Sequence, residues 1–396
     1  MTVHANTCPA FYLDATIDPV GSYSPCTALG GGAFRFDQQP FKTIWLSSEL
    51  ESARQQSAEG KKLDMCQRCW SEEKLGFTSE RQYLIADVAL GLNYTDVDYY
   101  YPGPKHLNIK VSNICNLRCR TCQSKDSYLY HIEGEYYEKK NNITQTAYTL
   151  EKFKKSFTND QLDELFECSK NLERIELYGG EPFLDNQIPK LLLKLIETGF
   201  SQHIDLSVST NATHKLTDTW RKILTSFREV MLNVSIDGIG DKFTYMRHPG
   251  DWTVVERNLK DFFQLEYASK TLTIKPVITV SALNVWHVPE VFDYFTRYNI
   301  EPFIILVQWP KYYCVNVYPE SVRSKIAQHL KDTGNVAFDP IINLMNTAPN
   351  VMDKSLGKTP WEEFKFWTKE KDEYRKESFV ETFSDVGNIL VEQSLW

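Results

Sequence analysis

The stretch "HLNIKVSNICNLRCRTCQ", residues 106–123, places three cysteines directly after an apolar β-strand pattern. The cysteines are Cys115, Cys119 and Cys122, so the first two stand four residues apart and the last two stand three apart. In parallel α/β folds, the loops at the carboxyl ends of the strands carry the chemistry. We therefore expect the three thiols to converge on one site at this edge of a sheet.

Five further apolar runs follow the first one, and helix-like segments alternate with them. The runs are rich in Val, Ile and Leu, as strands covered on both faces are. The segments between them repeat apolar residues at three- and four-residue spacing. Six βα units in about 200 residues predict a parallel sheet that is either open or curled into a partial barrel. The predicted strands are 106–114, 174–180, 204–212, 229–237, 273–282 and 301–307, and the predicted helices are 159–172, 186–199, 218–227, 253–267 and 288–299.

The segments on either side of this alternation have a different character. Residues 1–105 are irregular and rich in turns, and they end in a linker-like stretch that contains Pro102, Gly103 and Pro104. Residues 310–396 hold two or three helical or loop segments rich in charged and aromatic residues. We therefore expect three regions, 1–105, 106–309 and 310–396. Within the second region, the charged stretch 131–142 is expected to be a solvated insertion in the first βα connection, with a substrate-facing lid as the alternative.

The bulk properties exclude several classes of protein. The chain has 396 residues, of which 42% are apolar and 24% charged, as in ordinary globular proteins. The net charge of −8 argues against broad binding to nucleic acid. The sequence contains no apolar run long enough to cross a membrane and no secretory signal pattern at its start. We expect a cytoplasmic protein without a membrane partner.

The chain has nine cysteines. An odd, clustered set without an export signal predicts metal ligands in a reducing compartment rather than disulfides. A zinc site built on the three-cysteine loop would take a fourth ligand from elsewhere in the chain. A [4Fe–4S] cluster held by three thiolates would leave one iron open, and an open iron can bind and activate a small molecule.

The spacing C-x3-C-x2-C after the first strand resembles that of the radical S-adenosylmethionine (SAM) superfamily. The resemblance implies that Cys115, Cys119 and Cys122 hold a [4Fe–4S] cluster in a partial (β/α)6 TIM-like barrel. In that superfamily the open iron binds SAM. One electron from the cluster then cleaves SAM to a 5′-deoxyadenosyl radical, which abstracts hydrogen from a substrate. One departure from the pattern is Thr121, because many members place an aromatic residue there against the adenine.

Four further stretches resemble SAM-binding elements of the superfamily, namely "GGEP", "STNAT", "SIDG" and the arginine of "YMRHPG". A fifth stretch, "TVSALNV", follows the fifth predicted strand and is a weaker match near the adenine. For each polar residue, the alternative is a satisfied cap or turn residue. The predicted SAM-binding residues are Gly179, Gly180, Glu181, Pro182, Ser209, Asn211, Ser235, Asp237, Arg247 and Ser281, with Asn284 beside the last.

The four cysteines that precede the barrel resemble an auxiliary-cluster region, as found in twitch- or SPASM-containing radical SAM proteins. The resemblance implies a second, closed [4Fe–4S] cluster on Cys8, Cys26, Cys66 and Cys69, while a zinc ion fits the same spacing. Cys168 lies in a helical pattern and is expected to be a core thiol. Cys314 follows the last predicted strand. It is a candidate hydrogen donor of the kind that peptide epimerases of the superfamily use, with plain packing as the alternative.

The resemblance implies a radical SAM enzyme of oxidoreductase or lyase type. The favoured substrate is a ribosomally made precursor peptide, modified by epimerisation, cross-linking or splicease-like backbone excision. The alternatives are modification of a sugar or nucleoside, and a non-catalytic protein that carries a metal cluster. An external electron donor is expected. Because the cysteine region fills residues 1–105, any leader peptide is expected to be bound by a separate small protein.

Overall fold

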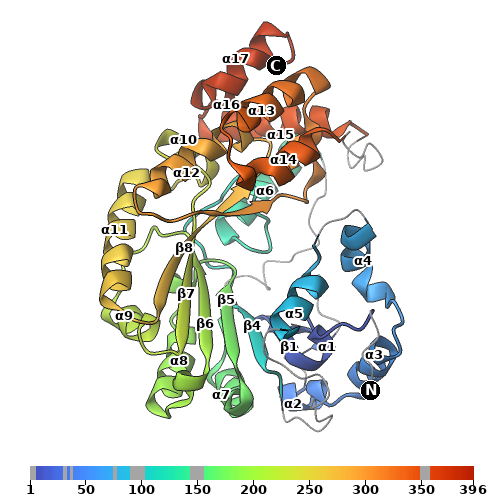
Figure 1. Cartoon of the computed structure of the whole chain (residues 1–396), viewed down its shortest axis with the longest axis vertical. Helices are drawn as coiled ribbons and strands as arrows, with labels where there is room; N and C mark the ends of the chain where they lie inside the picture. Colours follow the sequence, from blue (N-terminus) through green and yellow to red (C-terminus); the bar gives the residue numbers. More distant parts are fainter. Residues whose placement is uncertain are drawn as a thin grey trace.

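A single nine-stranded sheet organises the molecule (Figure 1). The computed structural model describes residues 6–29, 34–35, 39–74, 78–89, 103–142, 156–347 and 357–396. The strand order is β3-β2-β1-β4-β5-β6-β7-β8-β9, and all pairs from β4 to β9 are parallel. This confirms the predicted α/β class and the six predicted barrel strands. These six are β4 (His106–Lys110), β5 (Arg174–Tyr178), β6 (Asp205–Thr210), β7 (Glu229–Ser235), β8 (Leu272–Val280) and β9 (Phe303–Leu306).

The expectation that residues 1–105 are irregular is wrong for part of this region. Strand β1 (Asp14–Ile17) pairs in parallel with β4, while β2 (Ser22–Ser24) and β3 (Phe34–Arg35) add antiparallel strands beyond it. The four-residue run of β1 is too short to announce a strand, and it is fixed by pairing with a strand about 90 residues away. The sheet therefore contains strands from both sides of residue 105, where the sequence predicts a boundary between regions.

In the parts that the structure describes, the N-terminal region also supplies five helices. They lie beside the edge of the sheet that β1 extends (Figure 1). Cys66 closes a short 3-10 turn, η1 (Asp64–Cys66), which runs directly into the fourth of these helices. The helices are α1 (Ala10–Leu13), α2 (Phe41–Trp45), α3 (Ser48–Ala58), α4 (Gln67–Lys74) and α5 (Glu80–Ala89).

The helices of the βα units cover one face of the parallel strands. They are α7 (Asn159–Cys168), α8 (Ile188–Glu197), α9 (Asp218–Leu224), α11 (Trp252–Ala268) and α12 (Val288–Thr296), which confirms the five predicted helices. In α8, the buried Leu191, Leu192 and Leu195 show why this face closes. Each buried leucine contributes roughly 1.5–3 kcal/mol. The opposite face carries the polar residues of the strands, and the functional site lies there.

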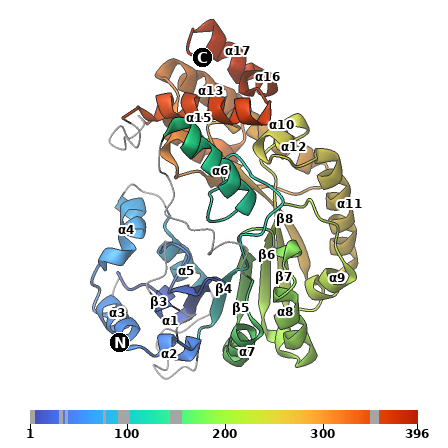
Figure 2. The ribbon, with the colours of Figure 1, turned by 180° about the vertical axis from the view of Figure 1, so that it is seen from behind.

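A helical layer covers the carboxyl end of the sheet (Figure 2). It contains α13 (Glu320–Asp332), α14 (Asp339–Met345), α15 (Pro360–Arg375), α16 (Phe379–Thr382) and α17 (Ser384–Glu392), with α10 (Asp241–Met246) next to α16. Within the ranges that the structure describes, no helix is long and apolar enough to span a membrane.

The expectation of a solvated insertion at 131–142 is wrong, because this stretch forms helix α6 (Tyr128–Asn141), which packs beside α15. His131, Glu133 and Tyr137 of α6 are buried. The Glu133 carboxylate pairs with Arg375, a residue that local sequence does not connect to it.

Candidate functional site

A cavity of about 780 Å³ opens at the carboxyl ends of the strands, where the sequence predicted the site. The three-cysteine loop that follows β4 forms part of its wall, and strands β1 and β2 form another part. Cys115, Cys119 and Cys122 share this wall with six of the predicted SAM-binding residues, namely Gly179, Gly180, Ser209, Asn211, Ser235 and Arg247.

The turn after β5 holds the cysteine loop by its backbone. Gly180 adopts a positive φ of 57°, and a Cβ added there would lie 2.5 Å from the carbonyl oxygen of Ile114. The amide of Glu181 donates to the same carbonyl at 2.9 Å. Glycine is therefore required at position 180 both for its conformation and for the close approach of the loop.

The Glu181 side chain ties the β5 turn to the end of β6 and does not line the cavity. It is fully buried, and its carboxylate accepts hydrogen bonds from Thr210 Oγ1 and from the amide of Asn211, both at 2.7 Å. Burial raises the pKa of Glu181 to about 7, although these hydrogen bonds oppose the shift. A direct contact of Glu181 with SAM stays a prediction.

The Cys115 thiol lies in a polar environment. The Asn211 side-chain amide approaches Cys115 Sγ at 3.8 Å, and the backbone amide of Leu117 donates to it at 3.4 Å. Burial raises the pKa of Cys115 to about 12. The metal-free protein therefore holds this thiol protonated at neutral pH, and binding of a metal must displace the proton.

Arg247 presents a fixed positive charge to the cavity. Its Nη2 pairs with Asp237 Oδ2 at 2.8 Å, and its Nη1 lies 3.9 Å from Cys119 Sγ. Asp237 also accepts from the amide of Thr279 at 2.8 Å, which fixes it between β7 and β8. Asp237 therefore positions Arg247 and is itself outside the cavity wall.

The remaining predicted residues have structural partners rather than cavity contacts. The Ser281 amide and hydroxyl both donate to Asn284 Oδ1, and Asn284 donates in turn to the carbonyls of Asp237 and Thr279. Ser281 and Asn284 thus lock the ends of β7 and β8 together. Pro182 and Cys314 also lie outside the cavity wall, so a hydrogen-donor role for Cys314 gains no support from its position.

Helix α15 also holds the cysteine loop, which the sequence did not reveal. Lys371 is buried, and its Nζ hydrogen-bonds to the carbonyl of Arg120 at 3.0 Å and to the hydroxyls of Tyr130 and Tyr313 at 2.9 Å. Burial lowers the pKa of Lys371 well below its usual value. A buried amine with three hydrogen-bonding partners fixes the loop between Cys119 and Cys122.

Arg375, at the end of α15, holds the preceding part of the loop. Its Nη2 donates to the carbonyl of Arg118 at 2.7 Å, and its Nε donates to both carboxylate oxygens of Glu133 at 3.1 Å. Both partners of this ion pair are almost inaccessible to solvent. Arg375 therefore couples the loop to α6 through a buried charge pair.

Arg120 is the third anchor between the loop and the C-terminal region. Its fully buried guanidinium stacks on Tyr245 at 3.6 Å and donates to Asp372 Oδ1 at 2.6 Å and Glu377 Oε2 at 2.5 Å. We call Lys371, Asp372, Arg375 and Glu377 the C-terminal clamp. The sequence offered two signals of the clamp, namely the arginines that flank Cys119 in "LRCRTC" and the charge-rich stretch "KEKDEYRKE". No local pattern shows that these two stretches contact each other.

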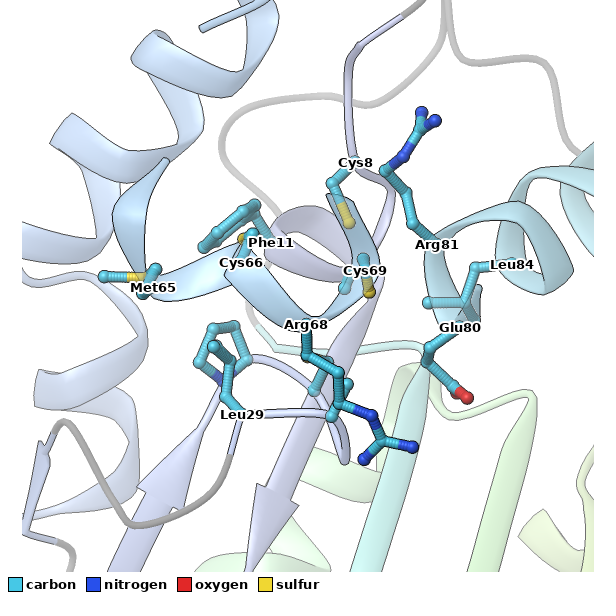
Figure 3. A pocket seen from close by; sticks show the side chains of 14 residues that line it. Cys8, Phe11, Leu29, Met65, Cys66, Arg68, Cys69, Glu80, Arg81 and Leu84 are labelled. Carbon is cyan, nitrogen blue, oxygen red and sulfur yellow. The ribbon is translucent and has the colours of Figure 1, made fainter. Parts of the chain in front are cut away.

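Cys8, Cys26, Cys66 and Cys69 line a second, smaller cavity in the N-terminal region (Figure 3). Burial raises the pKa of all four thiols, to about 12 for Cys26 and about 11 for Cys66. Among the described residues, no group of three His, Cys, Asp or Glu is arranged to hold a single metal ion. The four thiols nevertheless face one space, as a four-thiolate centre requires.

The size of this second cavity limits what it holds without rearrangement. Its volume of about 20 Å³ is enough for about one water molecule, and a [4Fe–4S] cluster is larger. Cluster binding would therefore require the four side chains to move apart, whereas the 780 Å³ cavity has room for a cluster together with SAM. Leu29 lines both cavities, so the two lie next to each other.

Comparison with known proteins identifies the central part of the chain. The radical SAM superfamily family model matches residues 109–279, which contain the three cysteines and the residues after β5, β6 and β7. The GTP 3′,8-cyclase of Campylobacter jejuni subsp. doylei is 27% identical over 146 residues, which are 37% of this chain and 39% of that protein. The corresponding cyclase of Campylobacter jejuni subsp. jejuni gives the same values. The match thus spans less than half of the length of these curated relatives.

Two solved structures show more distant likenesses. Native anSMEcpe with bound AdoMet has a TM-score of 0.40 at 17% identity, covering 64% of this chain and 67% of that chain. Streptococcus suis SuiB bound to S-adenosylmethionine has a TM-score of 0.37 at 16% identity, covering 84% and 70% respectively. Neither value bears on the substrate of this chain. The match of residues 109–279 to the radical SAM superfamily model, together with the likeness to the cyclases, points to an enzyme.

Proposed function

We propose that Cys115, Cys119 and Cys122 hold a [4Fe–4S] cluster whose fourth iron is left for SAM. The observation that carries this proposal is the shared cavity, which is lined by the three thiols, by the glycines, serines and asparagine at the ends of β5, β6 and β7, and by the arginine that follows α10. When bound and reduced, such a cluster supplies the electron that cleaves SAM to a 5′-deoxyadenosyl radical, which abstracts hydrogen from the substrate.

The residues of this chain orient SAM in the proposed site. Gly179 and Gly180 place the backbone of the β5 turn on the cavity wall, and their missing Cβ atoms leave room for the Lys110 side chain and for the cysteine loop. Arg247 is held by Asp237 with Nη1 toward the cysteines, where a guanidinium suits the carboxylate of SAM. Ser209 and Ser235 place hydroxyl groups on the neighbouring strands β6 and β7, where they can hold the ribose.

Anaerobic reconstitution with iron and sulfide tests this proposal. We expect the reconstituted chain to form 5′-deoxyadenosine from SAM and dithionite. Cys115→Ala, Cys119→Ala and Cys122→Ala should each abolish this product with the fold retained. Cys168→Ala is the matched control, because Cys168 is a thiol outside both cavities and should leave SAM cleavage unchanged. Wild-type protein that carries a full cluster and yields no 5′-deoxyadenosine would refute the proposal.

We further propose that the substrate is a ribosomally made precursor peptide. The charges in the cavity wall support a substrate without several anionic groups. Three cations line the wall, namely Lys110, Lys125 and Arg247. Lys110 Nζ lies 2.5 Å from Asp126 Oδ1 and Arg247 is paired with Asp237, so carboxylates compensate two of the three charges. A nucleoside triphosphate requires several free cations, whereas a peptide backbone does not.

A nucleoside triphosphate is the second candidate, because the sequence match to the GTP 3′,8-cyclases favours it. Incubation of the reconstituted enzyme with SAM, dithionite and GTP separates the two. Consumption of GTP coupled to 5′-deoxyadenosine would establish the nucleotide reaction. Unchanged GTP is the result that we expect.

For the N-terminal cavity, we propose a second [4Fe–4S] cluster on Cys8, Cys26, Cys66 and Cys69, as in twitch- or SPASM-type enzymes. The convergence of the four thiols on one cavity supports a metal centre there. Metal analysis decides its nature, since two clusters give about eight irons per chain and one cluster beside zinc gives about four. A stoichiometric zinc content would contradict the second cluster.

We also propose that an external reductant supplies the electron and that a separate small protein presents the leader of the peptide. A leader-bearing peptide that is modified at full rate by this chain alone would contradict the second part.

A further inference from the structure

Large apolar side chains are exposed on the face of the sheet that the βα helices leave open. Met231, Phe303 and Ile305 leave 40%, 44% and 46% of their surface accessible. Side chains of parallel strands are usually covered on both faces. Phe303 and Ile305 of β9 adjoin the half-buried Val277 of β8, and these three residues form what we call the lateral strip (Val277, Phe303 and Ile305). Met231 lies apart from it, because Asn233 and Lys275 stand between Met231 and Val277 in the pairing register.

The pairing register places the lateral strip on the same face as the SAM cavity. Ser235 stands opposite Val277, Val277 stands opposite Phe303, and Thr279 stands opposite Ile305. Residues directly opposite in a sheet point to the same side, and neighbouring strands lie about 4.8 Å apart. Because Ser235 and Thr279 line the cavity, the lateral strip continues the cavity wall by about one to two strand spacings.

Strand β9 is the last strand in the order of the described residues, so the lateral strip ends at the edge of the sheet. An extended segment laid beside β9 would hydrogen-bond through its backbone and present every second side chain to the strip. The charged side chain among β8 residues of this face is Lys275, whose Nζ lies 4.6 Å from the centroid of the Phe303 ring. The surface therefore suits an apolar segment without basic residues opposite Lys275.

We propose that an extended segment of the peptide substrate, apolar at alternate positions, docks on the lateral strip beside β9. Docking there carries the adjoining residue of the peptide into the SAM cavity. The proposal rests on the peptide substrate proposed above and adds the chemistry of the segment that flanks the reactive residue.

Binding of labelled synthetic peptides to the reconstituted, SAM-loaded enzyme tests the proposal by fluorescence anisotropy. One probe alternates valine with serine, and a second probe is the same peptide N-methylated at alternate amides, which removes the donors along one edge. We expect the first probe to bind wild type, and Ile305→Lys and the N-methylated probe each to weaken binding by about tenfold or more. Val336→Lys is the matched control, because Val336 is an exposed apolar residue outside the strip.

Other results of these measurements would overturn the proposal. Equal binding to wild type and Ile305→Lys, or no binding to wild type that cleaves SAM, overturns the lateral strip as a peptide site. Phe303→Ser serves as the second variant if Ile305→Lys loses its native circular dichroism spectrum. A wild-type dimer that Ile305→Lys converts to monomer would assign the strip to a second copy of the chain and also overturn the proposal. If wild type forms no 5′-deoxyadenosine, the proposed reaction is refuted. The peptide-binding measurements are a separate test, of the lateral strip alone.

Discussion

Arg375→Met tests whether the C-terminal clamp maintains the cysteine loop. The side chain is inaccessible to solvent, and it pairs with Glu133, which is equally buried, while it also donates to the carbonyl of Arg118. Methionine keeps most of the volume of the side chain but removes the charge and the three hydrogen bonds. The substitution therefore leaves a buried carboxylate and a buried carbonyl without these partners.

The expected loss follows from the remaining partners of Glu133. Removal of one member of a buried ion pair costs about 3–5 kcal/mol. Glu133 still has Arg118 Nε at 3.2 Å and accepts from the Tyr137 hydroxyl at 2.7 Å, which favours the lower end of that range. We expect the free energy of unfolding to fall by about 3 kcal/mol. If all of it is lost by local opening of the loop, the open population rises at most about 150-fold.

Two assays measure this effect. The urea midpoint of the metal-free protein should fall at an unchanged m-value, and a chelator should remove iron faster from the reconstituted protein. Lys369→Met is the control, because Lys369 is an exposed cation on the same helix. Adding Glu133→Gln to Arg375→Met removes the unpaired charge and should recover part of the stability. The reasoning is refuted if Arg375→Met behaves as Lys369→Met does in both assays.

Gly180→Ala should lower stability by about 1–3 kcal/mol and reduce iron loading, since it strains a positive φ and drives a Cβ against Ile114. Gly199→Ala has a similar φ of 78° but no atom within 4 Å, so a smaller loss there, measured by urea unfolding, would confirm the contribution of the contact. Arg247→Met should raise the Kd for SAM about 10- to 100-fold in a titration of the reconstituted protein, because a charged hydrogen-bonding partner of the carboxylate is lost, and an unchanged Kd would exclude that role. The folded-state pKa of Glu181 is raised to about 7, so this group stabilises the metal-free protein most at low pH, and its contribution of about 3 kcal/mol is lost as the pH rises through 7. Glu181→Gln should flatten the pH dependence of the urea midpoint between pH 5 and pH 8, and an unchanged slope would contradict the raised pKa.

The fold could be predicted where its signals are local. Each barrel strand is a continuous Val, Ile and Leu run, and each covering helix repeats its apolar residues at helical spacing, so the six strands and five helices follow from short windows of sequence. Strand β1 escaped because it has four residues, and its partner β4 begins only after the helices of the N-terminal region. The partner of a strand is a tertiary property that no local pattern states.

The candidate site divides in the same way. The cysteines and the glycines after β5 were found because their spacing is local, and the cavity contains them. Glu181, Asp237 and Ser281 were expected to contact SAM, yet their side chains join neighbouring strand ends. A motif gives the position of a polar residue, but it does not show whether the side chain contacts a ligand or a neighbouring strand end. That depends on burial and on the register of the strands.

The clamp explains how a loop with three cysteines can be ordered without a fourth ligand. The backbone of the cysteine loop forms hydrogen bonds with four other segments. The carbonyl of Ile114 accepts from the β5 turn, and the amides of Arg118 and Arg120 donate to residues 246–248. The carbonyls of Arg118 and Arg120 accept from α15, and that of Leu117 accepts from the Ser127 hydroxyl. In a four-thiolate centre the metal itself completes the closure of the loop. Here the closure comes from the protein, which in the proposed cluster would leave the fourth position for a ligand. The conformation of the cysteine loop therefore depends on the C-terminal region as well as on residues 109–279, which the superfamily model matches.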